Sequence, residues 1–498
     1  MVTDYILAID QGTSGTKAAV FDHDARLVGV AYGEITQYRP RPGWVEHDAS
    51  EIWDVTLKTV AEAFRNARIT AEDIVAVGVA NQSQTTVFWD RETGEPACRA
   101  ISWQDQRTVP ICEELKARDR AGIQSRTGMN IVANCAAPKI RWVMDNDRVI
   151  QRGLAKGRLV CGTIDTWLVW KLSGGAAHVT DLSNACVTLL LNTRTLSYDE
   201  WMLNELAIPR EILPELRSSS EIYAHTSPEA FFGVRLPIAG DAADQRAAVL
   251  GQACFQPATL KSTCGTGCSL ILNTGARRLA LVDGVSSAVL WGISGTVTWG
   301  LQGWTNVAGA AIQWLRDGLG IIKESSEADW LAGQVPDTRG LYFVPAFAGL
   351  GAPHMDPFAR GALLGISADT ARQHVARAAL EAIAYQVRDF FEIMQRWAGQ
   401  QPSVLRADGG GAKSDFLMQF QADILGIPIE RPEVMQTGAL GAAYLAGLAT
   451  GYWQSLEELA SLWRLERRFE PKMPAGRREE LYRGWQEAVG RIAGCLKE

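Results

Sequence analysis

Small polar residues that could bind phosphate follow a short apolar run close to the start of the chain. The run reads as a buried strand that ends at Asp10, and glycines and hydroxyl residues then lead to Lys17. Glycine lets the backbone approach an anion closely, and successive backbone N–H groups form a nest that binds it. The carboxylate of Asp10 suits a divalent cation or its waters. The stretch predicts a phosphate-binding hairpin, with an ordinary glycine-turn hairpin as the alternative. The turn residues are Thr13, Ser14 and Gly15.

The same arrangement recurs twice further along the chain. Residues 260–272 again read as strand, glycine-hydroxyl turn and strand, with Thr266 in the turn. A strand at 404–407 ends in three successive glycines, the second of which is Gly410. One glycine turn is weak evidence, but three at strand ends, with Asp244 nearby, favour phosphate binding. The repetition indicates two related domains, each with a phosphate hairpin, and no GxxxxGKS or GxxxxGKT pattern of a P-loop occurs.

Periodicity places these turns within an α/β framework. Residues 27–35 continue the first hairpin into a third strand, and a helix begins near Ser50 behind a capping pattern. The apolar run 74–80 reads as a buried strand. It delivers the polar residues 81–84 at its carboxyl end, the edge where open α/β sheets bind ligands. A helix of small residues at 437–449 is suited to close packing.

Length, charge and cysteine content narrow the class of protein. A chain of 498 residues exceeds one ordinary domain, so two large domains are expected. The net charge of -7 argues against a nucleic-acid partner. No apolar run is long enough to span a bilayer and the N-terminus does not resemble a secretion signal, so no membrane partner is expected. Nine cysteines without a CxxC motif favour the reducing cytoplasm as the location.

Sequence blocks spread over nearly the whole chain resemble the FGGY carbohydrate kinases of the actin-like ATPase superfamily, and among them the glycerol kinases. The most specific blocks are DQGT (10–13), PGWVEHD (42–48), WQDQRT (103–108), TIDTWLVWKL (163–172), GTGC (265–268), AGAAIQWLRD (308–317), VPAFAGLGAP (344–353) and LMQFQADILG (417–426). The segment 361–381 is similar to the second FGGY signature.

The resemblance implies an α/β fold in which two ribonuclease-H-like domains of the actin-like ATPase type flank a cleft. Residues 1–246 would form the polyol-binding domain and residues 247–498 the ATP-binding domain. The resemblance also implies transfer of the γ-phosphoryl group of ATP to a primary hydroxyl, with Mg²⁺ offsetting the charge of the phosphates. A homo-oligomer is expected because oligomers are common in the family.

Family positions carry over to individual residues of this chain. Asp244 matches the catalytic base, which accepts the proton of the attacking hydroxyl. Asp10 and Asp244 match the positions that hold Mg²⁺. The residues that match nucleotide-binding positions are Thr13, Ser14, Gly15, Lys17, Thr266, Gly309, Gln313, Gly410 and Ser414. Those that match substrate-binding positions are Ser83, Gln84, Trp103, Asn134, Asp244, Gln245 and Ser269.

The predicted substrate pocket departs from the glycerol kinase pattern. Ser83 and Gln84 stand where glycerol kinases carry an arginine-glutamate pair. Asn134 and Ser269 stand where they carry tyrosine and phenylalanine. A serine in place of phenylalanine would open the pocket and make its wall polar, which suits an acceptor with more hydroxyls. We therefore predict a small polyol or sugar substrate other than glycerol, with a tetritol such as erythritol or threitol first.

The sequence leaves three alternatives open. The chain could be a true glycerol kinase with a rearranged pocket, a pentulose kinase such as xylulokinase, or an inactive sensor that binds ATP and polyol. The intact Asp10, Asp244 and Thr266 argue against the sensor.

Two predicted nucleotide-binding positions also differ from the family pattern. Lys17 replaces an arginine and loses the fork geometry of the guanidinium, and Ser414 replaces an asparagine.

Overall fold

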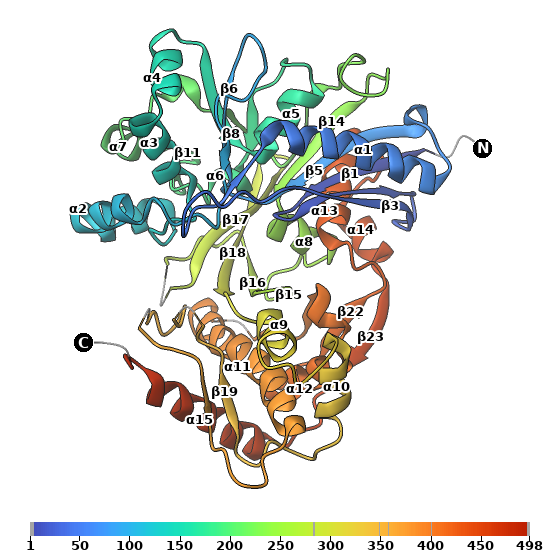
Figure 1. The fold of residues 1–498 in the computed structure, drawn as a ribbon. Helices are drawn as coiled ribbons and strands as arrows, with labels where there is room; N and C mark the ends of the chain where they lie inside the picture. Colours follow the sequence, from blue (N-terminus) through green and yellow to red (C-terminus); the bar gives the residue numbers. More distant parts are fainter. Residues whose placement is uncertain (1–3, 282–283, 348, 357, 400, 496–498) are drawn as a thin grey trace.

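The computed structural model describes residues 4–281, 284–347, 349–356, 358–399 and 401–495, and Figure 1 shows two lobes, which we call upper and lower. One thirteen-stranded sheet runs through both lobes. Its strands are, in spatial order, β23 (Leu465–Phe469), β22 (Ile429–Pro432), β21 (Leu405–Asp408), β15 (Leu260–Cys264), β16 (Cys268–Gly275), β18 (Thr296–Thr305), β17 (Ser286–Ile293), β13 (Ser220–His225), β14 (Pro237–Ala243), β5 (Ile74–Asn81), β1 (Tyr5–Gln11), β2 (Gly15–Phe21) and β3 (Leu27–Glu34).

Smaller sheets and fifteen α-helices complete the described part of the chain. A four-stranded sheet has the order β4 (Glu46–His47), β7 (Ala100–Ile101), β6 (Thr86–Asp90) and β8 (Leu159–Thr163). The helices are α1 (Ala49–Ala67), α2 (Val109–Thr127), α3 (Ala136–Asn146), α4 (Arg148–Ala155), α5 (Ile164–Leu172), α6 (Leu182–Ala185), α7 (Glu200–Glu205), α8 (Asp244–Gly251), α9 (Gly309–Asp317), α10 (Ser325–Ala332), α11 (Arg372–Ala398), α12 (Asp415–Leu425), α13 (Thr437–Thr450), α14 (Leu456–Leu462) and α15 (Ala475–Ile492). None of these described helices is long and apolar enough to cross a membrane.

The upper lobe begins with the predicted hairpin and its third strand. β1, β2 and β3 pair antiparallel in succession, and the buried β5 pairs parallel with β1. The predicted start of α1 is also confirmed, because the Asp48 side chain accepts hydrogen bonds from the backbone N–H groups of Ser50 and Glu51. The Glu51 carboxylate does not return the bond to residue 48 and instead accepts one from the Thr36 N–H at 3.0 Å. Only half of a capping box therefore forms.

Helix α13 comes from the second half of the chain but packs on the upper lobe, against β5, β14 and α8. Glycines permit this contact. A Cβ on Gly78 would lie 2.2 Å from the Ala442 carbonyl oxygen, and one on Gly441 would lie 1.7 Å from the carbonyl oxygen of Ala247. The close packing predicted for this small-residue helix is confirmed.

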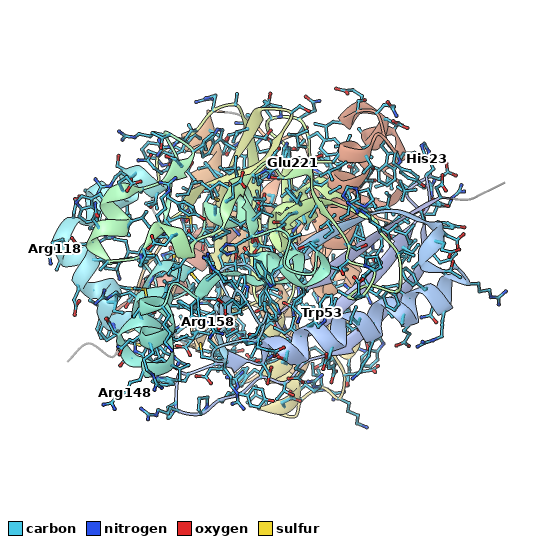
Figure 2. The ribbon with its side chains drawn as sticks, turned by 90° about the horizontal axis from the view of Figure 1, so that it is seen from above. His23, Trp53, Arg118, Arg148, Arg158 and Glu221 are labelled. Atoms are coloured by element: carbon cyan, nitrogen blue, oxygen red, sulfur yellow. The ribbon has the colours of Figure 1, made fainter. Side chains whose placement is uncertain are left out.

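The segment after α13 also lies on the upper lobe. His23, labelled in Figure 2, follows β2, and its ring centroid lies 4.9 Å from Tyr452 and 6.3 Å from Trp453. The predicted boundary after Arg246 falls inside α8. Helix α8 spans this point, and α13 from the second half of the chain packs on the upper lobe. The division of the chain into domains at 1–246 and 247–498 stays a prediction.

Candidate active site

The first predicted phosphate turn joins β1 to β2. In this ladder Asp10 lies opposite Lys17, and the two charges attract each other. The Trp103 Nε1–H donates to Thr13 Oγ1 at 2.8 Å. Ser14 is exposed at the tip, where its hydroxyl lies 3.4 Å from Gln37 Nε2. The hairpin thus forms as predicted, while its binding of phosphate stays a prediction.

Gly15 has a packing reason of its own. A Cβ at this position would lie 2.3 Å from the Gly33 carbonyl oxygen and 2.7 Å from the ring of Tyr32. Strand β3 therefore requires the glycine whether or not a nucleotide binds to the turn. The residue type alone is no evidence of phosphate contact here.

The second predicted turn joins β15 to β16 and lies against the start of α9. The N–H of Gly309 donates to the Gly265 carbonyl oxygen at 3.0 Å. The glycine run after β21 lies close by, because β21 pairs parallel with β15. A Cβ on Gly409 or on Gly411 would come within 2.6 Å of Cys264, so glycine is needed for this approach.

These turns border a cavity of about 440 Å³, which we call the lower-lobe cavity. All five nucleotide residues predicted in the second half of the chain line it, namely Thr266, Gly309, Gln313, Gly410 and Ser414. The Ser414 hydroxyl donates to Asp329 Oδ1 at 2.6 Å and accepts from the Leu417 N–H at 2.9 Å. One acceptor lone pair of this hydroxyl is left for a ligand.

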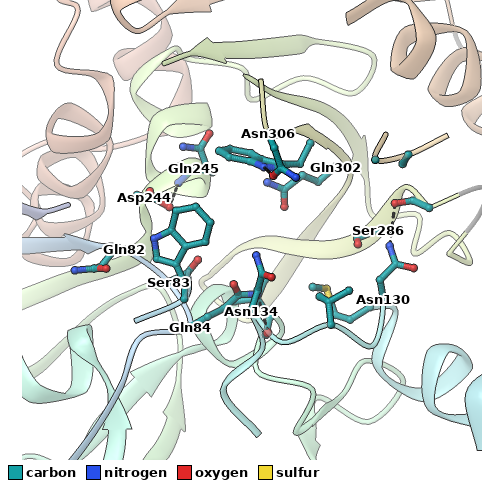
Figure 3. Close-up of a pocket in the computed structure, with 18 of the residues that line it drawn as sticks. Gln82, Ser83, Gln84, Asn130, Asn134, Asp244, Gln245, Ser286, Gln302 and Asn306 are labelled. Carbon is teal, nitrogen blue, oxygen red and sulfur yellow. Dashed lines mark hydrogen bonds between the residues drawn. The ribbon is translucent and has the colours of Figure 1, made fainter. Parts of the chain in front are cut away.

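A second cavity, of about 410 Å³, is lined by residues from both halves of the chain, and we call it the central cavity. Figure 3 shows amide and hydroxyl side chains around it. Six of the seven predicted substrate residues line it, namely Ser83, Gln84, Trp103, Asn134, Asp244 and Gln245. Trp103 meets Trp304 edge to face, with ring centroids 6.2 Å apart, so an aromatic pair joins the two halves here.

Ser269, the seventh predicted substrate residue, does not line the central cavity. It is fully buried on β16, directly opposite Trp304 of β18 in the ladder. Gln302 of the same strand donates through Nε2 to the Ser269 hydroxyl at 3.2 Å. Gln302 and Trp304 line the cavity here in place of Ser269, and the part of this serine in substrate binding stays a prediction.

Two carboxyl groups near the central cavity have raised pKa values. Burial raises the pKa of Asp10 to about 6, Lys17 opposes this shift, and the Asp244 carboxylate adds to it. Burial also raises the pKa of Asp244, against a hydrogen bond from the Gln245 N–H at 2.7 Å and the charges of Arg246 and Lys261. A carboxylate with a raised pKa is a better proton acceptor, which suits a general base.

A buried lysine connects this carboxylate region to the lower lobe. Lys261 on β15 is fully buried, and its Nζ donates to Gln245 Oε1 at 3.2 Å and also to Thr263 Oγ1. The same Nζ lies 3.7 Å from a carboxylate oxygen of the buried Asp408. Its charge lowers the pKa of both Asp10 and Asp244. Lys261 therefore links the wall of the central cavity to strand β21.

A second buried lysine supports the opposite wall. Lys139 on α3 is fully buried, and its Nζ donates to the carbonyl oxygens of Gln84 and Asn134. Burial lowers the pKa of Lys139 to about 7. Gln84 has φ of 70°, a left-handed conformation that non-glycine residues adopt rarely. The hydrogen bond from Lys139 supports this strained position, which is typical of a functional loop.

The donor set near Asp10 fits a magnesium ion that is shared with a ligand. No group of three or more His, Cys, Asp or Glu side chains among the described residues could hold a metal on its own. Mg²⁺ keeps several waters and is commonly held by one or two carboxylates together with substrate phosphates. Asp10 and Asp244 provide such a pair, close enough for the charge of one to raise the pKa of the other.

Sequence reasoning missed several residues of the central cavity. These are Met129, Asn130, Val132, Val187, Arg246, Gly284, Ser286, Gln302, Trp304, Asn306, Gly351, Ala352 and Met355, besides Gln82. The alternation along β18 is the one signal that was available, since Gln302 and Trp304 lie two positions apart on one face. Arg246 lies two positions after the predicted base, and no sequence pattern singles it out.

The comparisons with known proteins agree with this architecture. The family model "FGGY family of carbohydrate kinases, N-terminal domain" matches residues 5–251, and the corresponding C-terminal domain model matches residues 260–450. The chain is 50% identical over 494 residues to glycerol kinase 2 of Thermotoga maritima, an alignment that covers 99% of each chain. It is 49% identical over 492 residues to the glycerol kinase of Carboxydothermus hydrogenoformans, covering 99% of this chain and 98% of that one.

A solved structure gives the same result in three dimensions. The chain resembles the crystal structure of Plasmodium falciparum glycerol kinase with ADP, with a TM-score of 0.92, 33% sequence identity and coverage of 98% of both chains. The α/β fold with two domains of the actin-like type, predicted from the sequence, is thereby confirmed. From its two matched domain models and its full-length relatives, the chain belongs to the FGGY family of carbohydrate kinases.

Proposed function

We propose that this kinase transfers the γ-phosphoryl group of ATP to a primary hydroxyl of a small polyol. The nucleotide would occupy the lower-lobe cavity and the acceptor the central cavity. The observation that carries the proposal is the position of Asp244, a carboxylate with a raised pKa in the wall of a cavity whose polar side chains are mostly amides and hydroxyls. The relative solved with ADP supports the nucleotide part of the proposal.

In the proposed reaction the acceptor oxygen attacks the γ-phosphorus as Asp244 accepts the hydroxyl proton. The new bond joins this oxygen to the phosphorus, and the bond to the β,γ-bridging oxygen breaks, which releases ADP. Mg²⁺, held by Asp10, Asp244 and the phosphates, would offset negative charge on the transferred group. Lys17 and Thr13 would face the phosphates from the first hairpin, and Thr266 from the second.

Among uncharged polyols, glycerol is the first acceptor that we propose, because two relatives at 49–50% identity over nearly the full chain are named glycerol kinase. A four-carbon polyol such as erythritol or threitol is the second. It is supported by Ser83 and Asn134, which leave room beside polar walls where the family pattern has larger side chains. The central cavity, about 410 Å³, has space for on the order of ten waters, more than a three-carbon polyol fills.

A panel of acceptors tests the proposal. Purified enzyme is given MgATP with glycerol, erythritol, threitol, xylitol or a pentulose, and ADP formation is measured beside an Asp244→Asn variant. We expect turnover with at least one polyol and a loss on the order of 10²–10⁴-fold in kcat in the variant. The ranking by kcat/KM decides between glycerol, a tetritol and a pentulose. ADP formation that is no faster than in the Asp244→Asn variant with every acceptor would contradict the proposal and favour a binding protein.

A further inference from the structure

Arg246 is a buried cation in the wall of the central cavity. It lies in the first turn of α8, is 2% exposed, and lines the cavity together with Asp244 and Gln245. Its positive charge lowers the pKa of Asp244, so the guanidinium lies within electrostatic reach of that carboxylate, although no ion pair joins the two described side chains. Every other polar residue that lines this cavity carries an amide, a hydroxyl, an indole or the Asp244 carboxylate.

Among the described residues the guanidinium of Arg246 has unused donors. Its Nε and Nη2 are buried and donate to no described acceptor, and no ion pair joins it to a described carboxylate. Two other buried arginines behave differently. Arg107 and Arg388 are each held by two carboxylates at 2.6–2.9 Å. Arg246 differs from these two arginines because, within the described part of the chain, no carboxylate forms an ion pair with it and two of its donors are unused.

Burying a charge without a partner is strongly unfavourable, and charged side chains in protein interiors are normally paired. A guanidinium presents N–H donors in a planar fork that matches the two oxygens of a carboxylate. An unpaired fork in a ligand cavity thus points to an anionic group on the ligand.

We infer that Arg246 binds a carboxylate of the acceptor, so that the preferred substrate is an aldonate, a polyol chain with one end oxidised to the acid. The inference rests on the proposed transfer of phosphate from ATP to a primary hydroxyl, and it extends the acceptors from polyols to the acids derived from them. The primary hydroxyl would lie beside Asp244, and the carboxylate would lie at the other end of the chain, because two carboxylates side by side repel each other. The surrounding amides, including Gln84, Asn134 and Gln302, supply donors and acceptors for the hydroxyls between.

Matched pairs of acceptors test this inference. Glycerol is compared with D-glycerate, and erythritol with D-erythronate, in the parent enzyme and in Arg246→Gln and Arg246→Lys variants. We expect the parent to favour the acid of at least one pair by tenfold or more in kcat/KM. We expect Arg246→Gln to lower that acid-to-polyol ratio at least tenfold and Arg246→Lys, which keeps the charge but not the fork, to lower it less.

An exposed arginine provides the control. Arg148 lies at the start of α4, at the periphery of the molecule in Figure 2, and loses the same charge in Arg148→Gln. This variant is expected to keep the ratio of the parent. Melting temperatures are recorded for all variants, and Arg246→Gln is expected to melt no lower than the parent because it removes an unpaired buried charge.

Calorimetric titration of D-erythronate and erythritol, without ATP, separates the inference from the proposed function. Equal affinity of the parent for both compounds, or an equal loss with both in Arg246→Gln, would overturn the inference and place Arg246 near the nucleotide phosphates or Asp244. Turnover of polyols but of no aldonate would also overturn it while leaving the proposed function intact. If no acceptor is turned over, the proposed function fails. The two titrations still show whether Arg246 binds the carboxylate of D-erythronate.

Discussion

At the scale of single residues, groups whose charges are costly to bury lie in the wall of the central cavity or behind it. Asp10 and Asp244 both have raised pKa values, Lys139 has a lowered one, and Arg246 has no ion-pair partner among the described residues. Shifted pKa values and unpaired charges cluster at functional sites, because a group that binds a ligand or transfers a proton is held away from the water that would otherwise solvate it. Ligands and cations are expected to supply the missing partners.

Asp10 should reduce the stability of the free protein above about pH 6. Its folded-state pKa is about 6, against an ordinary value of 3.8, so the folded protein binds more protons than the unfolded chain between these values. Its contribution to stability is present below pH 3.8 and is lost as the pH rises through 6. We expect Asp10→Asn to raise the melting temperature by about 2 °C at pH 8, with roughly half that gain at pH 5.

The same variant should lose activity, by on the order of 10²-fold in kcat, because the amide is a poor ligand for Mg²⁺. The exposed Asp54 on α1 offers a matched control, since Asp54→Asn should change neither melting temperature nor kcat. Thermal unfolding at both pH values and a coupled ADP assay measure the two effects. A melting temperature that falls in Asp10→Asn at pH 8 would show that the carboxylate is stabilising after all.

At the scale of elements, the contact between α13 and α8 depends on glycines and alanines. The backbones of the two helices approach so closely that the Cα of Gly441 faces the carbonyl of Ala247. Protein interiors are close-packed, so an added methyl group here must displace backbone rather than a flexible side chain. This contact holds α8, which carries Asp244, against a helix from the second half of the chain.

Gly441→Ala is expected to destabilise the protein by about 1–3 kcal/mol in denaturant unfolding. Gly490 on α15 provides the comparison, because a Cβ there would meet nothing within 4 Å and the site is exposed. Gly490→Ala should stabilise by about 0.5–1 kcal/mol through helix propensity alone. Equal effects of the two substitutions would mean that the α13–α8 contact adapts more easily than its geometry indicates.

At the scale of the whole molecule, the central cavity is built from both halves of the chain. Thr13 and Trp103 come from the first half, and Trp304 and Met355 from the second. Kinases commonly close around both ligands, which excludes water from the reacting phosphate. A ligand that touches both walls will favour a more closed arrangement of the lobes, in proportion to its differential affinity for that state.

Limited proteolysis measures this closure. Trypsin digestion is followed with no ligand, with a non-hydrolysable MgATP analogue, with the best acceptor of the panel, and with both together. We expect the longest half-life of the intact chain with both ligands, exceeding the product of the separate gains, because each ligand favours the closed state for the other. Protection by one ligand that equals protection by both would argue that the lobes do not move in this way.

Local sequence determined the parts of the protein whose residues are neighbours along the chain. The hairpins at 10–17 and 260–272, the strand at 74–80 and the close-packed helix at 437–449 were all predicted, because turn chemistry and hydrophobic period are local properties. The sequence blocks that resemble the family predict the two-domain fold and the role of Asp244 as catalytic base. They do so because they preserve the order and spacing of specific residues, which composition alone does not show.

Only the tertiary structure decided which side chains form the walls. The family block predicts Ser269 in the pocket, but in the sheet this serine lies beside Trp304, is fully buried and does not line the cavity. Arg246 stands out by its burial and its unused donors, and Lys261 by its burial and its contact with Asp408, and neither property depends on sequence neighbours. A cavity wall is assembled from strands and helices hundreds of residues apart. Its composition therefore follows from packing, which local sequence does not specify.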